Sequence, residues 1–377
     1  MKLEASRSKT LKDQRIMFLS LYTFGVTGGI EQVCRVVSKA LAELKSKDQI
    51  SHYQCLSMYD DDADQRYISS AHFKGFKGHR ISFSRSLMTQ GLKSDIIILS
   101  HINLLIFGWL IKKLKPKSRI ILFAHGIEIW KPLTTWKKRF LQQEAEIWAV
   151  SRYTADTIQE KHHIPMGCIR ILNNCLDPYF RVPQRFDKPN KLLARYGLHA
   201  DHKILFTLTR QSSEEQYKGY DLVLTILSNL PNEVHYVLGG KVDDIEKQRV
   251  KDLIGEYGLQ NRVTLTGFIP DEEISSHYLL GDIFVMPSKA EGFGISFIEA
   301  AACGSKIIAG NQDGSRDALL DGELGALINP TAIRELQTAI LQQLETPSRP
   351  LRQQQKVLNN FGFKQYQDQI KQYLSIS

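Results

Sequence analysis

Short apolar runs recur along the chain, each bounded by glycine, proline or polar residues, and helix-forming segments separate them. In the first half the runs lie at residues 15–22, 95–100, 119–124, 145–150 and 169–173, and in the second half at 203–208, 235–238, 263–265 and 282–286. Runs of this length and setting are typical of buried strands, and strands that alternate with helices form parallel sheets with helices on both faces. A length of 377 residues exceeds what one hydrophobic core usually supports. The sequence therefore predicts two doubly wound α/β domains.

The stretch from 177 to 195 contains Pro178, Pro183 and Pro189, and we interpret it as the linker between the domains. We expect an N-terminal domain over residues 1–180 and a C-terminal domain over residues 195–362. A last helix is expected at about 363–374. Residues 60–93 are polar and basic, and apart from a loop at their acidic start their pattern predicts no element.

One strand, loop and helix carry the most specific pattern. Pro287 ends the strand because proline has no N–H to donate to a sheet, residues 288–294 form the loop, and the helix runs from 295 to 303. Glu291 and Glu299 stand eight positions apart around this glycine-rich turn. Glycines allow backbone N–H groups to approach a ligand closely, a helix N-terminus favours an anion, and carboxylates accept hydrogen bonds from sugar hydroxyls. The pattern favours a site for a phosphate-bearing sugar, although the spacing alone would also fit two solvated glutamates on a surface loop.

Two cations follow the strand at 203–208. Arg210 comes directly after it, and Lys218 lies beyond a short polar loop. Each alone would be interpreted as a surface charge. Together they suit a diphosphate, because arginine binds phosphate oxygens in pairs and lysine adds a compact charge.

The first half offers two weaker candidates. Gly28 and Gly29 lie between the first strand and a helix, and His125 follows the strand at 119–124. Ligands of open α/β sheets bind at the carboxyl ends of strands, which is where these residues stand. A tight turn and a structural histidine are the alternative interpretations. The glycine pattern is not G-x-G-x-x-G, so it does not favour a nicotinamide cofactor.

The sequence Glu291-Gly292-Phe293-Gly294 with Glu299, followed by Ala300 to Gly304, resembles the E-x7-E signature of the family 4 retaining glycosyltransferases. The resemblance covers nearly the whole chain. It implies the GT-B fold, in which two Rossmann-like domains face a central cleft. It further implies that the N-terminal domain binds the acceptor, that the C-terminal domain binds a nucleotide sugar, and that a C-terminal helix at about 363–377 packs back on the first domain.

The resemblance also implies roles for single residues. Arg210 and Lys218 would grip the donor diphosphate, Glu299 would bind ribose hydroxyls, and Glu291 with the Phe293 and Gly294 amides would bind the donor sugar. The remaining donor contacts would come from the glycine loop at Gly28 and Gly29, from the nucleobase border at Gly267, Phe268 and Ile269, and from Gly292. His125 would contact the donor sugar or the acceptor. We group His125, Arg210, Lys218 and Glu291 as catalytic and the others as donor-binding.

The implied reaction moves a hexose from a UDP- or GDP-sugar to a hydroxyl of a glycan or lipid-linked acceptor, with retention, in cell-surface polysaccharide or glycolipid synthesis. No cofactor and no obligate metal are expected. A sugar-nucleotide epimerase or a phosphorylase of the same fold is an alternative. A nucleic-acid-binding protein is a further one, but no helix-turn-helix, zinc pattern or aromatic and basic interleaving supports it.

Charge is unevenly distributed, because residues 1–185 hold 29 Lys and Arg against 16 Asp and Glu, a net +13, within a total of +9. Clusters at Lys112, Lys113, Lys115, Lys117 and Arg119 and at Lys137, Lys138 and Arg139 fit either an anionic membrane surface or a solvated face. Neither a membrane-spanning run nor an apolar signal segment at residues 1–15 is found, so we expect a cytoplasmic protein, with peripheral attachment to the inner face of the membrane as a further expectation. An odd number of cysteines without a C-x-x-C pair favours reduced thiols.

Overall fold

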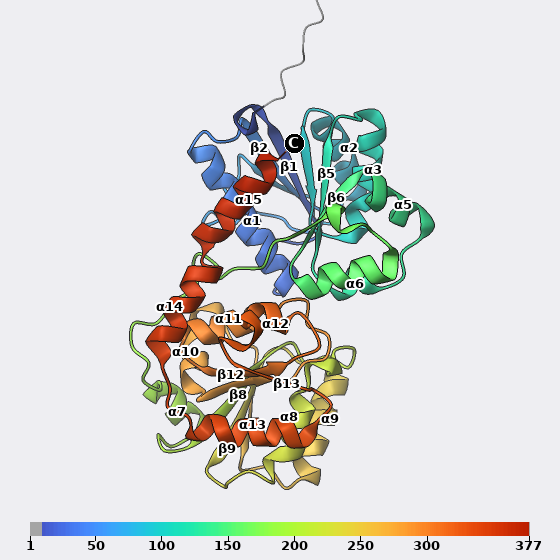
Figure 1. Ribbon diagram of the computed structural model, residues 1–377. Helices are drawn as coiled ribbons and strands as arrows, with labels where there is room; N and C mark the ends of the chain where they lie inside the picture. The colour runs from blue at the N-terminus through green and yellow to red at the C-terminus, as the bar shows by residue number, and fades with distance from the viewer. Residues whose placement is uncertain (1–9, 377) are drawn as a thin grey trace, which may run out of the picture. The chain divides into compact units, whose positions relative to one another are not determined.

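The computed structural model describes residues 10–376. Residues 1–9, which belong to the expected first domain and to the segment 1–15 searched for a signal, lie outside the described residues, as does residue 377. The chain divides into two units (Figure 1). One comprises the described residues up to Asp177 together with those from Phe363 on, and the other runs from Pro178 to Gly362.

The first unit contains a parallel sheet of seven strands in the order β3-β2-β1-β4-β5-β6-β7. Its strands are β1 (Arg15–Ser20), β2 (His52–Ser57), β3 (Phe73–Gly75), β4 (Ile96–Leu99), β5 (Arg119–Ala124), β6 (Ala145–Ala149) and β7 (Ile169–Ile171). Its α-helices are α1 (Gly29–Ser46), α2 (Arg80–Gly91), α3 (Leu105–Leu114), α4 (Ile127–Trp130), α5 (Thr135–Gln143), α6 (Arg152–His162) and α15 (Phe363–Ser375).

The second unit contains a parallel sheet of six strands in the order β10-β9-β8-β11-β12-β13. Its strands are β8 (Lys203–Leu208), β9 (Val234–Gly239), β10 (Val263–Gly267), β11 (Ile283–Met286), β12 (Lys306–Gly310) and β13 (Ala326–Ile328). Its α-helices are α7 (Asn190–Tyr196), α8 (Tyr220–Leu227), α9 (Asp244–Glu256), α10 (Asp271–Leu280), α11 (Ile295–Ala302), α12 (Ser315–Ala318), α13 (Ile333–Glu345) and α14 (Pro350–Phe361).

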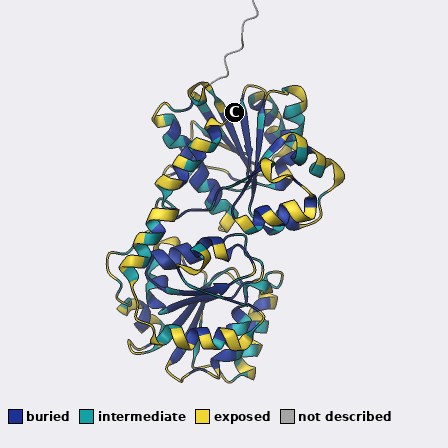
Figure 2. Ribbon diagram, viewed as in Figure 1, coloured by how far each residue is buried: buried dark blue, intermediate teal, exposed yellow. Residues whose placement is uncertain are grey.

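Each sheet lies between helices, and its central strands are buried along almost their whole length (Figure 2). A core of apolar side chains from β8, β9, β11, α8 and α13 fills one face of the second sheet. This burial explains why the strands are continuous apolar runs, as parallel strands covered on both faces require. The predicted class, two doubly wound α/β domains, is confirmed.

The structure differs from the expected elements in several places. Residues 60–93 contain β3 and α2, and β2, β12 and β13 were not expected. These strands are short or mix polar with apolar residues, so their pattern is weak. The expected linker at 177–195 belongs to the second unit, which begins at Pro178, and α7 occupies its last part. Arg195 and Tyr196 tie α7 to α10 through Glu273 and His277.

Helix α15 is part of the first unit although the second unit precedes it in the chain. It packs against α1, and Arg119 donates from its guanidinium to the carbonyls of Tyr373 and Leu374 at 3.1 and 2.8 Å. The same guanidinium forms two hydrogen bonds to the Glu146 carboxylate. These contacts hold the last turn of α15 at the amino ends of the strands β5 and β6.

Candidate donor and acceptor sites

In each sheet the strand order reverses once, between β1 and β4 in the first and between β8 and β11 in the second. The connections from such a neighbouring pair leave on opposite sides, so a crevice opens at the carboxyl ends of the two strands. In the second unit the loop after β8 carries Arg210 and Lys218, and the loop after β11 carries Glu291. The topology therefore brings the three predicted charged residues to one edge of the sheet.

Glycines let these two loops approach each other closely. Gly219 has φ of +77°, and a Cβ there would lie 2.4 Å from the carbonyl oxygen of Pro287. Two residues before Gly219, the Tyr217 carbonyl accepts a hydrogen bond from the Lys289 N–H at 2.9 Å. Any larger residue at 219 would separate the loops, so the Lys218-Gly219 pair has a steric basis.

Lys218 and Glu291 form an ion pair across the two loops, with 2.5 Å between Nζ and Oε2. Their side chains are 14% and 16% exposed, so both charges are largely removed from water. Burial alone would lower the pKa of the Lys218 ammonium, but the Glu291 carboxylate more than offsets this and the pKa is raised. Lys218 therefore carries its positive charge throughout the physiological range.

A buried carboxylate that the sequence analysis did not identify holds the Glu291 loop. Asp313 is fully buried and accepts hydrogen bonds from the N–H groups of Glu291 and Ser315 at 2.7 and 3.0 Å. Burial raises the pKa of Asp313 to about 6. Asp313 follows β12, a strand that the sequence pattern does not predict, so no local pattern places Asp313 beside Glu291.

The glycine-rich turn itself lies where it was expected. Gly294 precedes α11 with φ of +91°, and a Cβ there would lie 2.3 Å from the Phe297 ring. The Phe293 side chain is buried against Phe361, with 5.6 Å between ring centroids. The Phe293 ring is therefore part of the core and is not a surface for a ligand. Gly292 lies beside Gly314. A Cβ added at position 314 would lie 2.1 Å from the Gly292 carbonyl oxygen.

Glu299 lies on the second turn of α11 and is 8% exposed. The hydroxyl of the fully buried Tyr278 on α10 donates to its Oε2 at 2.9 Å. Burial and, next, the Glu299 carboxylate raise the pKa of Tyr278 well above its usual value, so Tyr278 stays a donor. This hydrogen bond fixes the orientation of the carboxylate.

Arg210 forms an ion pair with a carboxylate other than Glu291, the partner of Lys218. Its side chain is 64% exposed and forms an ion pair with Glu215, which is 18% exposed. The two predicted cations thus contact different carboxylates, both from the same edge of the sheet.

The expected nucleobase border lies at the end of β10, one of the two edge strands of the second sheet. Gly267 has φ of +65°, Ile269 is buried, and the Phe268 ring is 52% exposed. Lys241 Nζ lies 5.0 Å from the centroid of that ring. An exposed aromatic ring is a suitable surface on which a base could stack.

In the first unit, His125 lies at the carboxyl end of β5 and its Nε2 donates to the carbonyl of Ser100, after β4, at 2.9 Å. Burial lowers the pKa of His125 to about 4, so the imidazole is neutral near pH 7. Its backbone N–H donates to Glu128 at 2.6 Å, and burial raises the pKa of Glu128. His125 thus lies at the carboxyl end of a strand, as expected, and β5 is the neighbour of β4 on the side away from the order reversal.

Gly28 and Gly29 are exposed at the start of α1. The loop before them is held by Asp60, a buried residue that accepts hydrogen bonds from the N–H groups of Thr23 and Gly25, each at 2.6 Å. Asp60 also accepts from the Ser57 hydroxyl at 2.6 Å. The sequence pattern predicts only a loop at Asp60, because the Thr23 and Gly25 N–H groups that it binds are 37 and 35 positions away.

Within residues 10–376, no group of three or more His, Cys, Asp or Glu side chains is arranged as metal ligands would be. In the same part of the chain the five cysteines are free thiols.

Comparison with known proteins gives these sites a context. The model for "Glycosyl transferases group 1" matches residues 193–375 and that for "Glycosyltransferase Family 4" matches residues 27–180. A GDP-mannose-dependent alpha-(1-6)-phosphatidylinositol monomannoside mannosyltransferase of Mycolicibacterium smegmatis is 28% identical over 246 residues, which is 61% of this chain and 62% of that protein. The alpha-D-kanosaminyltransferase of Streptomyces kanamyceticus is 26% identical over 57% of this chain and 55% of that protein. Both alignments span less than two thirds of the relative.

Solved structures match over a longer range. The Anabaena protein HepE in complex with UDP and glucose has a TM-score of 0.78 at 20% identity, over 97% of this chain and 100% of that chain. Sucrose-phosphate synthase from Thermosynechococcus elongatus has a TM-score of 0.77 at 20% identity, over 96% and 98%. This similarity confirms the predicted GT-B fold.

Proposed function

Because the chain belongs to the family 4 glycosyltransferases, we propose that it is a retaining hexosyltransferase that uses a UDP- or GDP-sugar as donor. Its acceptor is a hydroxyl of a glycan or of a lipid-linked glycan in cell-surface polysaccharide or glycolipid synthesis. The observation that carries this proposal is the Lys218–Glu291 pair at the strand-order reversal of the second sheet, since it puts a cation for phosphate beside a carboxylate for sugar hydroxyls.

In the reaction, the bond between the sugar C1 and the diphosphate oxygen breaks while the acceptor oxygen forms a bond to C1 on the same face. Negative charge grows on the diphosphate, and Lys218 and Arg210 stabilise it. The departing diphosphate oxygen takes the proton of the acceptor hydroxyl, so no protein group has to act as nucleophile. Two cations supply the charge that a metal would otherwise supply, and the proposed reaction needs no obligate metal.

The donor sugar is held by Glu291 and by the backbone of Phe293 and Gly294. Glu299 accepts hydrogen bonds from the ribose, and Phe268 lies beside the base. The comparisons support two donor bases: one relative is named as GDP-mannose-dependent, and HepE was solved with UDP.

Thermal stabilisation by UDP, GDP and ADP, each with and without a chelator, tests the donor site. We expect a shift with one diphosphate that the chelator leaves unchanged. A shift abolished by the chelator would contradict the metal-independent site, and no shift with any diphosphate would contradict the proposed function. Retention is then tested by proton NMR of the first product formed, since the anomeric configuration of product and donor must agree.

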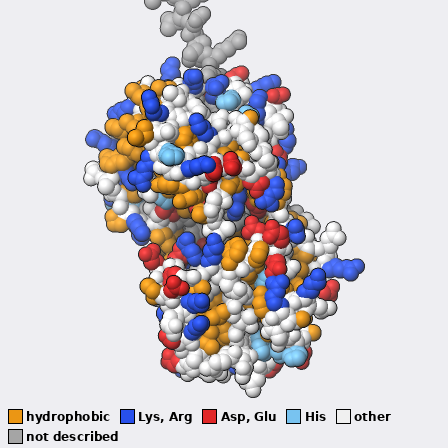
Figure 3. Space-filling model, turned by 180° about the vertical axis from the view of Figure 1, so that it is seen from behind, with side chains coloured by type: hydrophobic (Ala, Val, Ile, Leu, Met, Phe, Trp, Pro, Cys, Tyr) orange, Lys and Arg blue, Asp and Glu red, His pale blue; other side chains and the backbone are white. Residues whose placement is uncertain are grey.

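The acceptor is proposed to be reached at the inner face of the membrane. Among the described helices none is long and apolar enough to cross a membrane. On α3 and α5, Ile106, Leu114 and Trp136 are 40%, 62% and 39% exposed, and Trp109 and Trp136 lie 6.3 Å apart between ring centroids. Apolar side chains beside lysines suit an anionic lipid surface. Figure 3 shows Lys and Arg side chains lying among hydrophobic ones on one face of the first unit.

Part of the expected basic cluster is used within the protein. Arg119 binds Glu146 and α15, Lys115 donates to the Ser94 carbonyl at 2.6 Å, and Lys112 donates to that of Ser118 at 2.9 Å. The exposed Lys113, Lys117 and Arg139 are the residues of these clusters that we propose contact the lipid headgroups.

Sedimentation with vesicles of phosphatidylglycerol and of phosphatidylcholine tests the proposed membrane contact. Trp136→Ala should weaken binding to the anionic vesicles, whereas Leu351→Ala in the second unit should not. Equal binding to both lipids would contradict the charge argument.

A further inference from the structure

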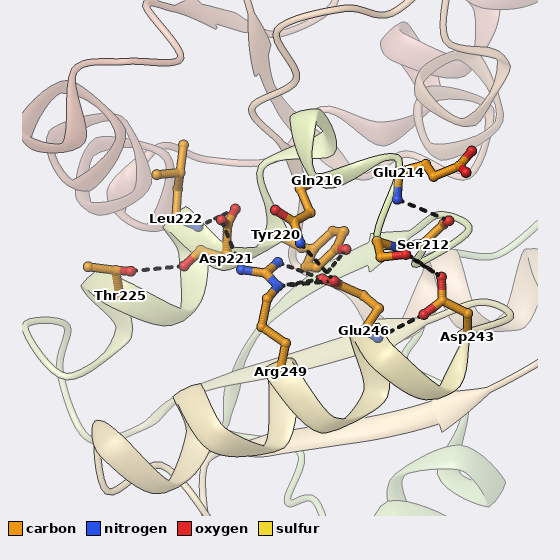
Figure 4. A network of polar contacts seen from close by, with 11 residues as sticks. Ser212, Glu214, Gln216, Tyr220, Asp221, Leu222, Thr225, Asp243, Glu246 and Arg249 are labelled. Carbon is orange, nitrogen blue, oxygen red and sulfur yellow. Dashed lines mark hydrogen bonds and ion pairs between the residues drawn. The ribbon is translucent and has the colours of Figure 1, made fainter.

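The first turn of α9 is joined to the loop that carries Lys218 by a network of polar contacts (Figure 4). At its centre lies Glu246, whose side chain is fully buried. A buried carboxylate is costly unless it is hydrogen-bonded and its charge is balanced. The partners of Glu246 therefore indicate what it is for.

Two of these partners lie on either side of Lys218. The Gln216 amide donates to Glu246 Oε2 at 3.1 Å, and the Tyr220 hydroxyl donates to Oε1 at 2.5 Å. Gln216 stands two positions before Lys218 and Tyr220 two positions after it. One carboxylate thus binds both ends of the five-residue segment whose middle residue is Lys218.

The same turn of α9 holds the loop nearer its start. Asp243, the N-cap of α9, accepts hydrogen bonds from the Glu246 N–H at 2.7 Å and from the Ser213 N–H at 2.8 Å. Gln211 pairs with Val242 as an isolated parallel bridge. The loop that begins beside Arg210 is therefore attached at 211 and 213 to the residues just before α9, and at 216 and 220 to Glu246 in its first turn.

Arg249 balances the charge of Glu246. Its guanidinium donates to both carboxylate oxygens, with Nη2 at 2.5 Å from Oε1, and its Nη1 lies 3.4 Å from Asp221. Burial alone would raise the pKa of Glu246, but the hydrogen bonds, chiefly from Arg249, more than offset this and the pKa is lowered. Glu246 is thus an anion that accepts from Gln216 and Tyr220 at neutral pH.

We propose that Glu246 is a positioning residue for the donor diphosphate, which acts through Gln216 and Tyr220 to hold Lys218 at the edge of the second sheet. This inference rests on the donor role proposed for Lys218. Lysine has four rotatable side-chain bonds and loses much conformational freedom when it is fixed. A backbone held on both sides reduces what remains to be ordered when the phosphate binds.

The test compares phosphate-bearing and phosphate-free ligands. The variants are Gln216→Ala, whose side chain is exposed, Tyr220→Phe, which keeps the ring packed, and the two combined. The probes are the diphosphate among UDP, GDP and ADP that the unaltered chain binds, measured by calorimetry, and the matching nucleoside, measured by NMR titration. Gln248→Ala is the control, because Gln248 donates to Asp252 on the exposed face of the same helix.

We expect the double variant to bind the diphosphate roughly fivefold more weakly, as loss of one or two hydrogen bonds implies, with the nucleoside affinity and the Gln248→Ala variant unchanged. Equal losses for diphosphate and nucleoside would mean general damage and would overturn the inference, as would no loss at all. Lys218→Ala distinguishes failure of the positioning role of Glu246 from failure of the donor role of Lys218. If it weakens the diphosphate while the double variant does not, the inference alone fails. If it has no effect, the donor role of Lys218 fails as well.

Discussion

Lys218 and Glu291 stand 73 positions apart in the chain and meet as one ion pair at the carboxyl edge of the second sheet. Each neutralises the other in a place that is largely shielded from water. A pair of this kind is stable as a pair but costly to break from one side. It follows that the two residues have different and measurable effects when changed.

Lys218→Ala should reduce kcat/KM for the donor roughly 100- to 1,000-fold, the usual effect of removing one donor to a developing anion. Lys289→Ala is the matched control, since its side chain is exposed two positions before Glu291. Steady-state kinetics with a fixed acceptor measure both. Near-normal turnover by Lys218→Ala would remove this residue from the diphosphate site.

Glu291→Gln should separate binding of the leaving group from transfer. Without the carboxylate charge Lys218 is less neutralised, so the affinity for the free nucleoside diphosphate should rise roughly threefold or more. Transfer from the sugar nucleotide should nevertheless fall, because the charged acceptor for a sugar hydroxyl is gone. Calorimetry and initial rates give the two numbers. A fall in both would mean that Glu291 serves the loop fold rather than the sugar.

The ribose assignment of Glu299 predicts a loss of discrimination. The unaltered chain should prefer the ribonucleoside diphosphate over its 2′-deoxy analogue, and Glu299→Gln should reduce that preference, roughly by the worth of one charge-assisted hydrogen bond. Tyr278→Phe, which removes the hydroxyl that orients Glu299, should have a smaller effect in the same direction. An unchanged preference in Glu299→Gln would place the ribose elsewhere.

Asp313 predicts a pH dependence with a definite sign. Its pKa is about 6 in the folded chain, above the ordinary value of 3.8, so between about pH 4 and 6 the folded state binds more protons than the unfolded one. The free energy of unfolding should therefore fall as pH rises through this window, by an amount on the order of 3 kcal/mol. Asp313→Asn should remove this component of the slope in denaturant titrations. The same slope in variant and parent would contradict the assignment.

His125 should contribute with the opposite sign. Its folded pKa of about 4 lies below the ordinary 6.5, so the unfolded state binds the additional proton between these values. The first unit should lose stability as pH falls through this window, and His125→Asn should reduce that loss. Hydrogen exchange followed separately in the two units distinguishes this effect from that of Asp313.

The residues that the sequence identified are those with a local signal. Glu291 and Glu299 belong to one glycine-rich turn and the helix that follows it. Lys218 precedes Gly219, which has a left-handed backbone conformation and lies close to the Pro287 carbonyl. Asp60, Asp313 and Glu246 were not identified, because each is an ordinary acidic residue in the sequence and its role comes from partners 22 to 37 positions away. All three are buried, and burial depends on which strands are neighbours. The strand order that decides this is not encoded in any single segment.

Helix α15 completes the first unit only after the whole second unit has been synthesised, because residues 178–362 lie between them. During translation, Arg119 emerges from the ribosome more than 250 residues before the carbonyls of Tyr373 and Leu374 that it binds. The second unit, by contrast, is continuous and can close its sheet as soon as β13 and α13 have emerged. The later half of this polypeptide is therefore free to reach its native packing before the earlier half does, which reverses the usual order of folding on the ribosome.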